Sequence, residues 1–149
     1  MKKTIKTSVI IAVYNAINSA KLTKLTDIDK FKVIRMARSM KDIASGFNDF
    51  TKDAQEKLKD ESFDIMVEKA QQWQREGENT TLTEEERVAV NRYFSEYNKK
   101  VDECVRTEAD KNVDIEFELL TEEAFMQLAA SNDWTCGQII ELEDLVCKE

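Results

Sequence analysis

The stretch Val113-Asp114-Ile115-Glu116-Phe117-Glu118-Leu119 is the main determinant of the predicted fold, because it alternates apolar and acidic side chains without a break. Side chains of a strand point alternately to opposite faces, so this pattern predicts one short strand at about 113–119, with its apolar face on helices and its acidic face in water. A lone strand leaves backbone groups unpaired. We therefore expect it to pair with the N-terminus around Lys3 to Thr7 or with a second copy of the chain.

Apolar residues in the rest of the chain recur three and four positions apart, the spacing of one face of an α-helix. This spacing predicts a helix over residues 8–20 and, after a connection at residues 21–25, a long helix whose apolar side chains repeat every seven residues from Val33 to Leu58. A further apolar face covers residues 63–73. The pattern leaves open whether residues 26–76 form one helix or two.

Threonines and glycines mark the expected helix ends. Threonines stand at the start of four predicted helices: Thr26, Thr83, Thr121 and Thr135. Thr83 and Thr135 are each followed by Glu or Gln at the third position, the pattern of a capping box. Gly77 is expected to end the helix before it in a left-handed conformation. Gly46 lies inside a predicted helix at a cost of about 1 kcal/mol relative to alanine, which indicates a close approach by another helix.

Length and composition agree with a helical domain. The chain has 149 residues, of which 42% are hydrophobic, and it contains three glycines and no proline. Long helices joined by few turns are the natural arrangement for such a composition. We predict a single domain over 1–149 and a mainly α fold, a helical bundle of about five or six helices with one short strand.

Charge is distributed unevenly along the chain. Residues 1–45 carry ten Lys/Arg and three Asp/Glu, whereas residues 46–149 carry twelve and twenty-seven. The candidate anion- or partner-binding residues are basic side chains of the N-terminal part: Lys24, Lys32, Arg35, Arg38 and Lys41. The last four of these lie opposite the apolar stripe of their helix. They would serve a protein partner, self-association or nucleic acid, or simply solvate a helix face.

Several kinds of chemistry are excluded by the residues that the chain lacks. It has no histidine, which excludes Ser-His-Asp and Cys-His catalysis and histidine-containing zinc sites. Its three glycines lie too far apart for a phosphate-binding loop, and its three cysteines lack Cys-x-x-Cys spacing. Acidic clusters are explained by helix caps and by the outer face of the strand. We therefore predict no enzyme activity, no catalytic residue, no cofactor and no metal site.

Trp134 precedes the cap at Thr135, the position from which an apolar residue packs back onto its helix. A contact with a partner is the alternative role for this side chain. No signal peptide or membrane-spanning stretch is recognised, and the three cysteines make an odd count. We expect a cytoplasmic location with no membrane attachment and no small-molecule substrate.

The order of the predicted elements resembles a class of short uncharacterised proteins encoded by tailed bacteriophages and prophages. A short apolar helix leads to a long charged helix, an acidic middle and then the strand. A final helix follows a Leu-Thr-Glu-Glu turn at Leu120–Glu123 and an Asn-Asp-x-Thr turn at Asn132–Thr135. The resemblance implies a bacterial host cell, with association to the virion as a further option. It carries over no catalytic or binding residue.

The absent chemistry, the uneven charge and the long helices favour a non-enzymatic interaction or assembly accessory that binds other proteins. One alternative is a nucleic-acid-binding accessory that uses the basic N-terminal half. We expect no exposed aromatic residue among the cations of the basic stretch, and the chain as a whole is acidic, which weighs against this alternative. A second alternative is an acidic protein that mimics nucleic acid and inhibits a host enzyme.

Overall fold

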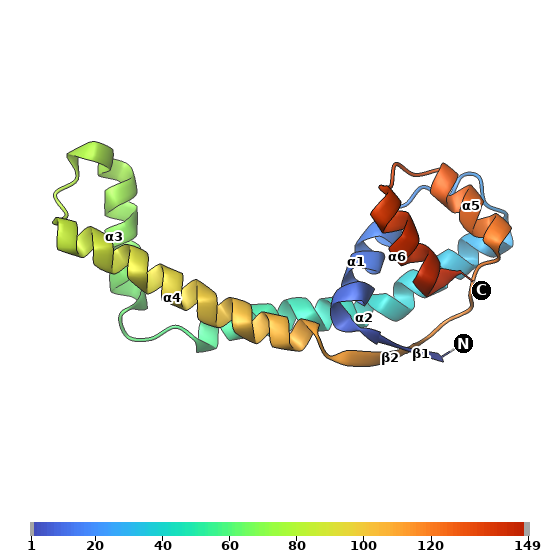
Figure 1. Ribbon diagram of the computed structural model, residues 1–149, viewed down its shortest axis with the longest axis horizontal. Helices are drawn as coiled ribbons and strands as arrows, with labels where there is room; N and C mark the ends of the chain where they lie inside the picture. The colour runs from blue at the N-terminus through green and yellow to red at the C-terminus, as the bar shows by residue number, and fades with distance from the viewer. Residues whose placement is uncertain (1, 148–149) are drawn as a thin grey trace. The chain divides into compact units, whose positions relative to one another are not determined.

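Strand β1 (Lys2–Lys6) pairs antiparallel with strand β2 (Asn112–Glu116) in the computed structural model, which describes residues 2–147. The register runs from Lys2 opposite Glu116 to Lys6 opposite Asn112. The two strands lie side by side in Figure 1. Of the two partners predicted for the strand, the N-terminus is confirmed.

The strand ends at Glu116 and not at Leu119 as predicted, and Glu116 pairs with Lys2, the first residue that the structure describes. The predicted alternation nevertheless continues beyond the ladder. Ile115, Phe117 and Leu119 are buried, and the acidic residues between them are exposed. Burial therefore follows the sequence pattern beyond the last residue of β2.

Side chains reinforce the join between the two strands. Thr4 Oγ1 donates to Asp114 Oδ1 at 2.6 Å, and Lys2 Nζ lies 3.3 Å from Asp114 Oδ2. The hydrogen bond from Thr4 and then the contact with Lys2 lower the pKa of Asp114. The backbone N–H and the hydroxyl of Thr7 both donate to the carbonyl of Lys111 at 2.9 Å. The end of the ladder is thus tied directly to the next helix.

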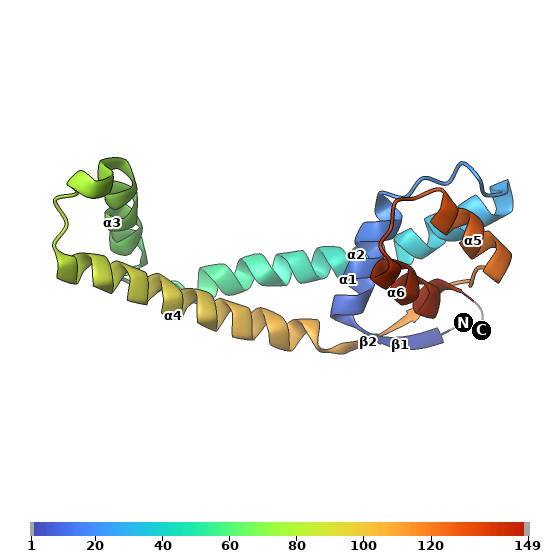
Figure 2. The same cartoon turned by 45° about the horizontal axis from the view of Figure 1, so that its top comes forward.

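The remaining elements are helical, and they are shown in two views in Figures 1 and 2. The helices are α1 (Thr7–Asn18), α2 (Asp27–Lys57), α3 (Phe63–Glu76), α4 (Glu84–Ala109), α5 (Glu122–Ala130) and α6 (Cys136–Val146), with a 3-10 turn η1 (Gly77–Asn79) after α3. The predicted fold class, mainly α with about five or six helices and one short strand pair, is confirmed. Residues 26–76 form two helices.

Threonine side chains cap four helices at the predicted places. Each accepts the backbone N–H three residues further on: Thr26, Thr83, Thr121 and Thr135. Two of these caps are reciprocal. The N–H of Thr83 donates to Glu86 Oε1 at 3.4 Å, and the N–H of Thr135 donates to Gln138 Oε1 at 2.9 Å. Both predicted capping boxes are therefore present.

The chain forms two compact units. Unit 1 comprises Met1–Asn48 and Glu108–Glu149, and unit 2 comprises Asp49–Thr107. The boundaries fall within α2 and α4, so each of these helices contributes to both units. The prediction of a single domain over 1–149 stays a prediction.

Unit 1 contains a continuous apolar core. Its fully buried side chains come from α1, α2, α5 and α6 and from the segment after β2: Ile10, Val13, Val33, Met36, Met40, Leu120, Leu128, Leu142, Leu145 and Val146. Phe117 and Leu119 join the same cluster. The first and last segments of the sequence therefore share one core.

Unit 2 has a much smaller buried core. The buried apolar residues within it are Ala54, Leu82, Val90 and Val101. No residue of α3 is buried, and Trp73, the last residue of the apolar face predicted at 63–73, is only half-buried. Aromatic contacts add to the packing, since the ring centroid of Phe63 lies 6.1 Å from that of Phe94 and 5.1 Å from that of Tyr97.

Two tyrosines of α4 hold the connection between α2 and α3. The Tyr93 hydroxyl donates to Asp60 Oδ1 at 2.6 Å, and the Tyr97 hydroxyl donates to the carbonyl of Gln55 at 2.8 Å. Partial burial and the hydrogen bond to Asp60 raise the pKa of Tyr93 to about 12. The same hydrogen bond lowers the pKa of Asp60. Polar anchoring thus supplements the small core of this unit.

The surroundings of Gly46 and the backbone conformation of Gly77 differ from the predictions. The prediction that another helix approaches Gly46 is wrong, because a Cβ placed there would meet no atom within 4 Å. Gly77 does follow the end of α3 and has a φ of 59°, but its ψ of −130° lies outside the left-handed helical region. Gly46 is therefore an exposed weak point of α2, whereas Gly77 holds a backbone conformation that suits glycine.

Replacing Gly46 with alanine should raise the free energy of unfolding by about 0.5–1 kcal/mol, because alanine loses less backbone entropy in a helix. Thermal melting should show this as a rise of roughly 1–4 °C. Gly77→Ala is the matched control and should destabilise, since its φ of 59° strains any other residue. A lowered melting temperature for Gly46→Ala would contradict the open surroundings of that position.

Replacing Phe117 with alanine should lower the free energy of unfolding by about 3–5 kcal/mol, because a large buried side chain is lost from the core of unit 1. The neighbouring exposed residue is the control, and Glu116→Ala should change stability by less than about 0.5 kcal/mol. Denaturant unfolding measures both values. Equal stability of the two variants would mean that the segment after β2 does not pack on the core.

Candidate partner-binding pocket

The five predicted basic residues do not act as one face, because acidic residues neutralise two of them. Lys32 Nζ lies 3.6 Å from Glu118 Oε1 and 3.8 Å from Asp29 Oδ1. Arg35 Nη1 lies 3.9 Å from Glu118 Oε2. The Lys32 side chain is only 15% exposed, so little of its charge faces solvent. Glu118, the last acidic residue of the alternating stretch, thus contacts two of the four predicted basic residues on α2.

Arg38 and Lys41 differ from these two residues. Both are exposed, and neither forms an ion pair or a side-chain hydrogen bond within residues 2–147. They lie three positions apart on α2 and line the same pocket. Lys24 lies elsewhere, in a shallow depression that it shares with Glu122 and Glu123. The structure therefore brings together two of the five predicted residues at one site.

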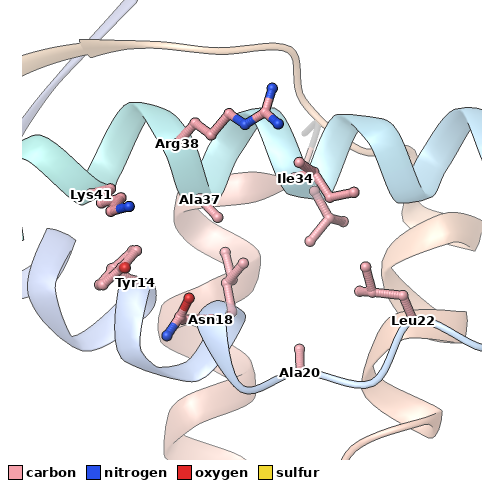
Figure 3. Close-up of a pocket in the computed structure, with 10 residues that line it drawn as sticks. Tyr14, Asn18, Ala20, Leu22, Ile34, Ala37, Arg38 and Lys41 are labelled. Carbon is pink, nitrogen blue, oxygen red and sulfur yellow. The ribbon is translucent and has the colours of Figure 1, made fainter.

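The pocket lies between α1 and the first part of α2 and has a volume of about 290 Å³. We call it the α1–α2 pocket. Its lining consists of Tyr14, Ile17, Asn18, Ala20, Leu22, Val33, Ile34, Ala37, Arg38 and Lys41. Figure 3 shows Tyr14 and Lys41 at one end of the pocket and Leu22 at the other. No carboxylate lines it, which sets it apart from the rest of this acidic chain.

Helical spacing builds the pocket. Positions three and four apart lie on one side of a helix, so α1 presents Tyr14 together with Ile17 and Asn18. The same spacing on α2 places Ala37 between Ile34 and Lys41. The buried Ile17 also belongs to the unit 1 core, which fixes the apolar floor. The exposed polar residues of the lining, Asn18, Arg38 and Lys41, form its rim.

Sequence reasoning did not identify Tyr14 and Asn18 as site residues. Each is a single polar side chain on a short apolar helix, and nothing in the spacing shows which α2 residues they will face. The available signal was their i, i+4 separation beside Ile17. This separation indicates a site only when the packing of α1 against α2 is known.

Trp134 lies outside the pocket. Its side chain is half-buried and packs against the unit 1 core, next to the cap at Thr135. This position agrees with an apolar residue that packs back onto its helix. A contact between Trp134 and a partner stays a prediction.

Comparisons of the chain with protein-family models, with curated proteins and with solved structures found no match. The resemblance to phage proteins stays a prediction. No helix within residues 2–147 combines the length and the apolar character needed to cross a membrane. Over the same residues, no group of three or more acidic or cysteine side chains is arranged to hold a metal ion.

Proposed function

We propose that the protein is a non-enzymatic interaction or assembly accessory of phage or prophage type that acts in the cytoplasm. Its partner is a protein, and the α1–α2 pocket is the place where that partner docks. The observation that carries the proposal is an apolar floor beside two cations, Arg38 and Lys41, that form no ion pair within residues 2–147. The proposal of no enzyme activity rests on the residue types that the chain lacks.

The chemistry of the pocket defines what fits it. An apolar side chain would fill the floor formed by Ile17, Val33 and Ile34, while an adjacent carboxylate would reach the cations at the rim. An amphipathic acidic helix presents this combination, and grooves between helices commonly bind such helices. Apolar anchors in small pockets supply much of the affinity of protein interfaces, and charges at the rim mainly add specificity and speed of association.

Size favours a side-chain anchor over a cofactor. Pockets that bind drug-sized ligands have volumes of roughly 300–1,000 Å³ and enclose most of the ligand. The α1–α2 pocket, at about 290 Å³, falls just below that range, and its rim is open at Asn18 and Arg38. It holds one or two side chains of a partner more readily than a whole organic cofactor.

The distribution of ion pairs favours protein over nucleic acid as the partner. Affinity for nucleic acid grows with the number of phosphates that basic residues neutralise. Lys32 and Arg35 already contact Glu118, and Lys24 shares its depression with Glu122 and Glu123. Two free cations beside an apolar floor suit one acidic segment better than a phosphate backbone.

A pull-down from the native host tests the proposal. Tagged protein should retain a specific partner, and the double variant Arg38→Glu/Lys41→Glu should lose it, because the reversed charges repel an acidic segment. Lys99→Glu/Arg106→Glu is the matched control, since it reverses two exposed cations in a depression that also contains Asp102 and Glu103. Equal retention by the pocket variant and the parent protein would contradict the proposal.

A further inference from the structure

We infer that the α1–α2 pocket binds helix α6 of a second copy of this chain, with Ile140 as the apolar anchor and Glu143 and Asp144 as the charges that meet Arg38 and Lys41. The inference rests on the proposed function, because it names the partner of the same pocket. It begins from the outer face of α6.

Ile140 is a large apolar side chain that is 55% exposed. Glu143 and Asp144 follow it at the third and fourth positions, so all three side chains lie on one side of α6. Both carboxylates are exposed, and neither forms an ion pair within residues 2–147. Helix α6 thus presents an apolar centre beside two unpaired negative charges, which is the complement of the pocket.

The two carboxylates stand at the electrically unfavourable end of their helix. Carboxylates in a last turn face the negative end of the helix dipole and gain from a cation supplied by another element. Helix α6 has no basic residue of its own from Cys136 to Val146. Lys3 does reach this end, but its Nζ donates to the backbone carbonyls of Asp144 and Leu145 at 3.0 and 3.1 Å. Within residues 2–147 Lys3 forms no ion pair with either carboxylate, and Arg38 and Lys41 of a second copy would pair with both.

Met126 and Val88 are two of the other exposed apolar residues near carboxylates, and each has a cation in the same depression. Met126 is 64% exposed, and the depression it shares with Glu122 and Glu123 contains Lys24. Val88 is 52% exposed, and its depression contains Arg92 in addition to two glutamates. At either position, Arg38 and Lys41 of a second copy would meet glutamates that already have a cation nearby. Ile140 is a better match than these two residues, because Glu143 and Asp144 form no ion pair within residues 2–147.

The anchor and the pocket belong to the same compact unit. Helix α6 packs on α1, the helix that forms one wall of the pocket, and the two lie next to each other in both Figures 1 and 2. A two-fold pair of chains can therefore insert each α6 into the pocket of the other copy, so that both contacts form at once. Two-fold dimers with such self-complementary surfaces are the commonest soluble oligomers.

Charge exchange between two variants tests this inference. Variant A is Arg38→Glu/Lys41→Glu, and variant B is Glu143→Lys/Asp144→Lys. Like charges oppose each other in a pair of A chains and in a pair of B chains, whereas both contacts are complementary in a mixed pair. Light scattering under reducing conditions, because Cys136 is exposed, should follow association from about 10 μM to about 1 mM, the range of weak dimers. Circular dichroism should confirm that each variant is folded.

We expect the parent protein to dimerise, each variant alone to bind itself at least about tenfold more weakly, and a one-to-one mixture of A and B to recover dimers. The control Lys99→Glu/Arg106→Glu should dimerise like the parent. Added salt should weaken the parent dimer, since the charged side chains on both sides of the contact are exposed to solvent and are screened. A monomeric parent, unchanged association of A or B, or a mixture that stays monomeric would each overturn the inference. A monomeric parent whose host partner is still lost on pocket reversal would leave the proposed function standing.

Discussion

The antiparallel pairing of β1 with β2 is the constraint on which the structure of unit 1 depends. It joins segments that lie 110 positions apart at the hydrogen bond between Thr4 and Asp114. Closing so large a loop is entropically costly, so the contacts that the pairing makes possible have to offset that cost. They do so because the strand after Asn112 delivers Ile115, Phe117 and the following leucines into a core built from both ends of the chain. The terminal Lys3 adds its bonds to the last turn of α6.

The candidate site follows from the same constraint. Helix α1 begins at Thr7, immediately after β1, and Thr7 is bonded to Lys111 at the start of the ladder. The direction in which α1 leaves the sheet is therefore fixed, and with it the side that faces α2. The pocket lies where that side meets an apolar part of α2. Its floor includes Ile17 and Val33 of the unit 1 core, and packed core side chains lose little further freedom on binding.

Much of the fold was predictable because its determinants are local. The alternation after Asn112 predicted which side chains are buried, and the threonines predicted four helix starts, since capping involves only a few neighbouring residues. Features set by distant contacts were not predictable. The end of the strand at Glu116 had no local signal, and Lys32 and Arg35 form ion pairs because Glu118 lies beside α2. The pocket residues of α1 had no local pattern that pointed to them. Sequence reasoning therefore found the cations but not the cavity beside them.

Amide hydrogen exchange followed by nuclear magnetic resonance tests the central role of the strand pairing most directly. If unit 1 depends on that pairing, the bonded amide of Thr7 and the amides within the β1–β2 ladder should open only when the whole unit unfolds. Their exchange should then be as slow as that of buried residues in α1 and α6, such as Val13 and Leu142. Ladder amides that exchange much faster while Val13 and Leu142 stay protected would show that the core holds without the strands, and would contradict this account.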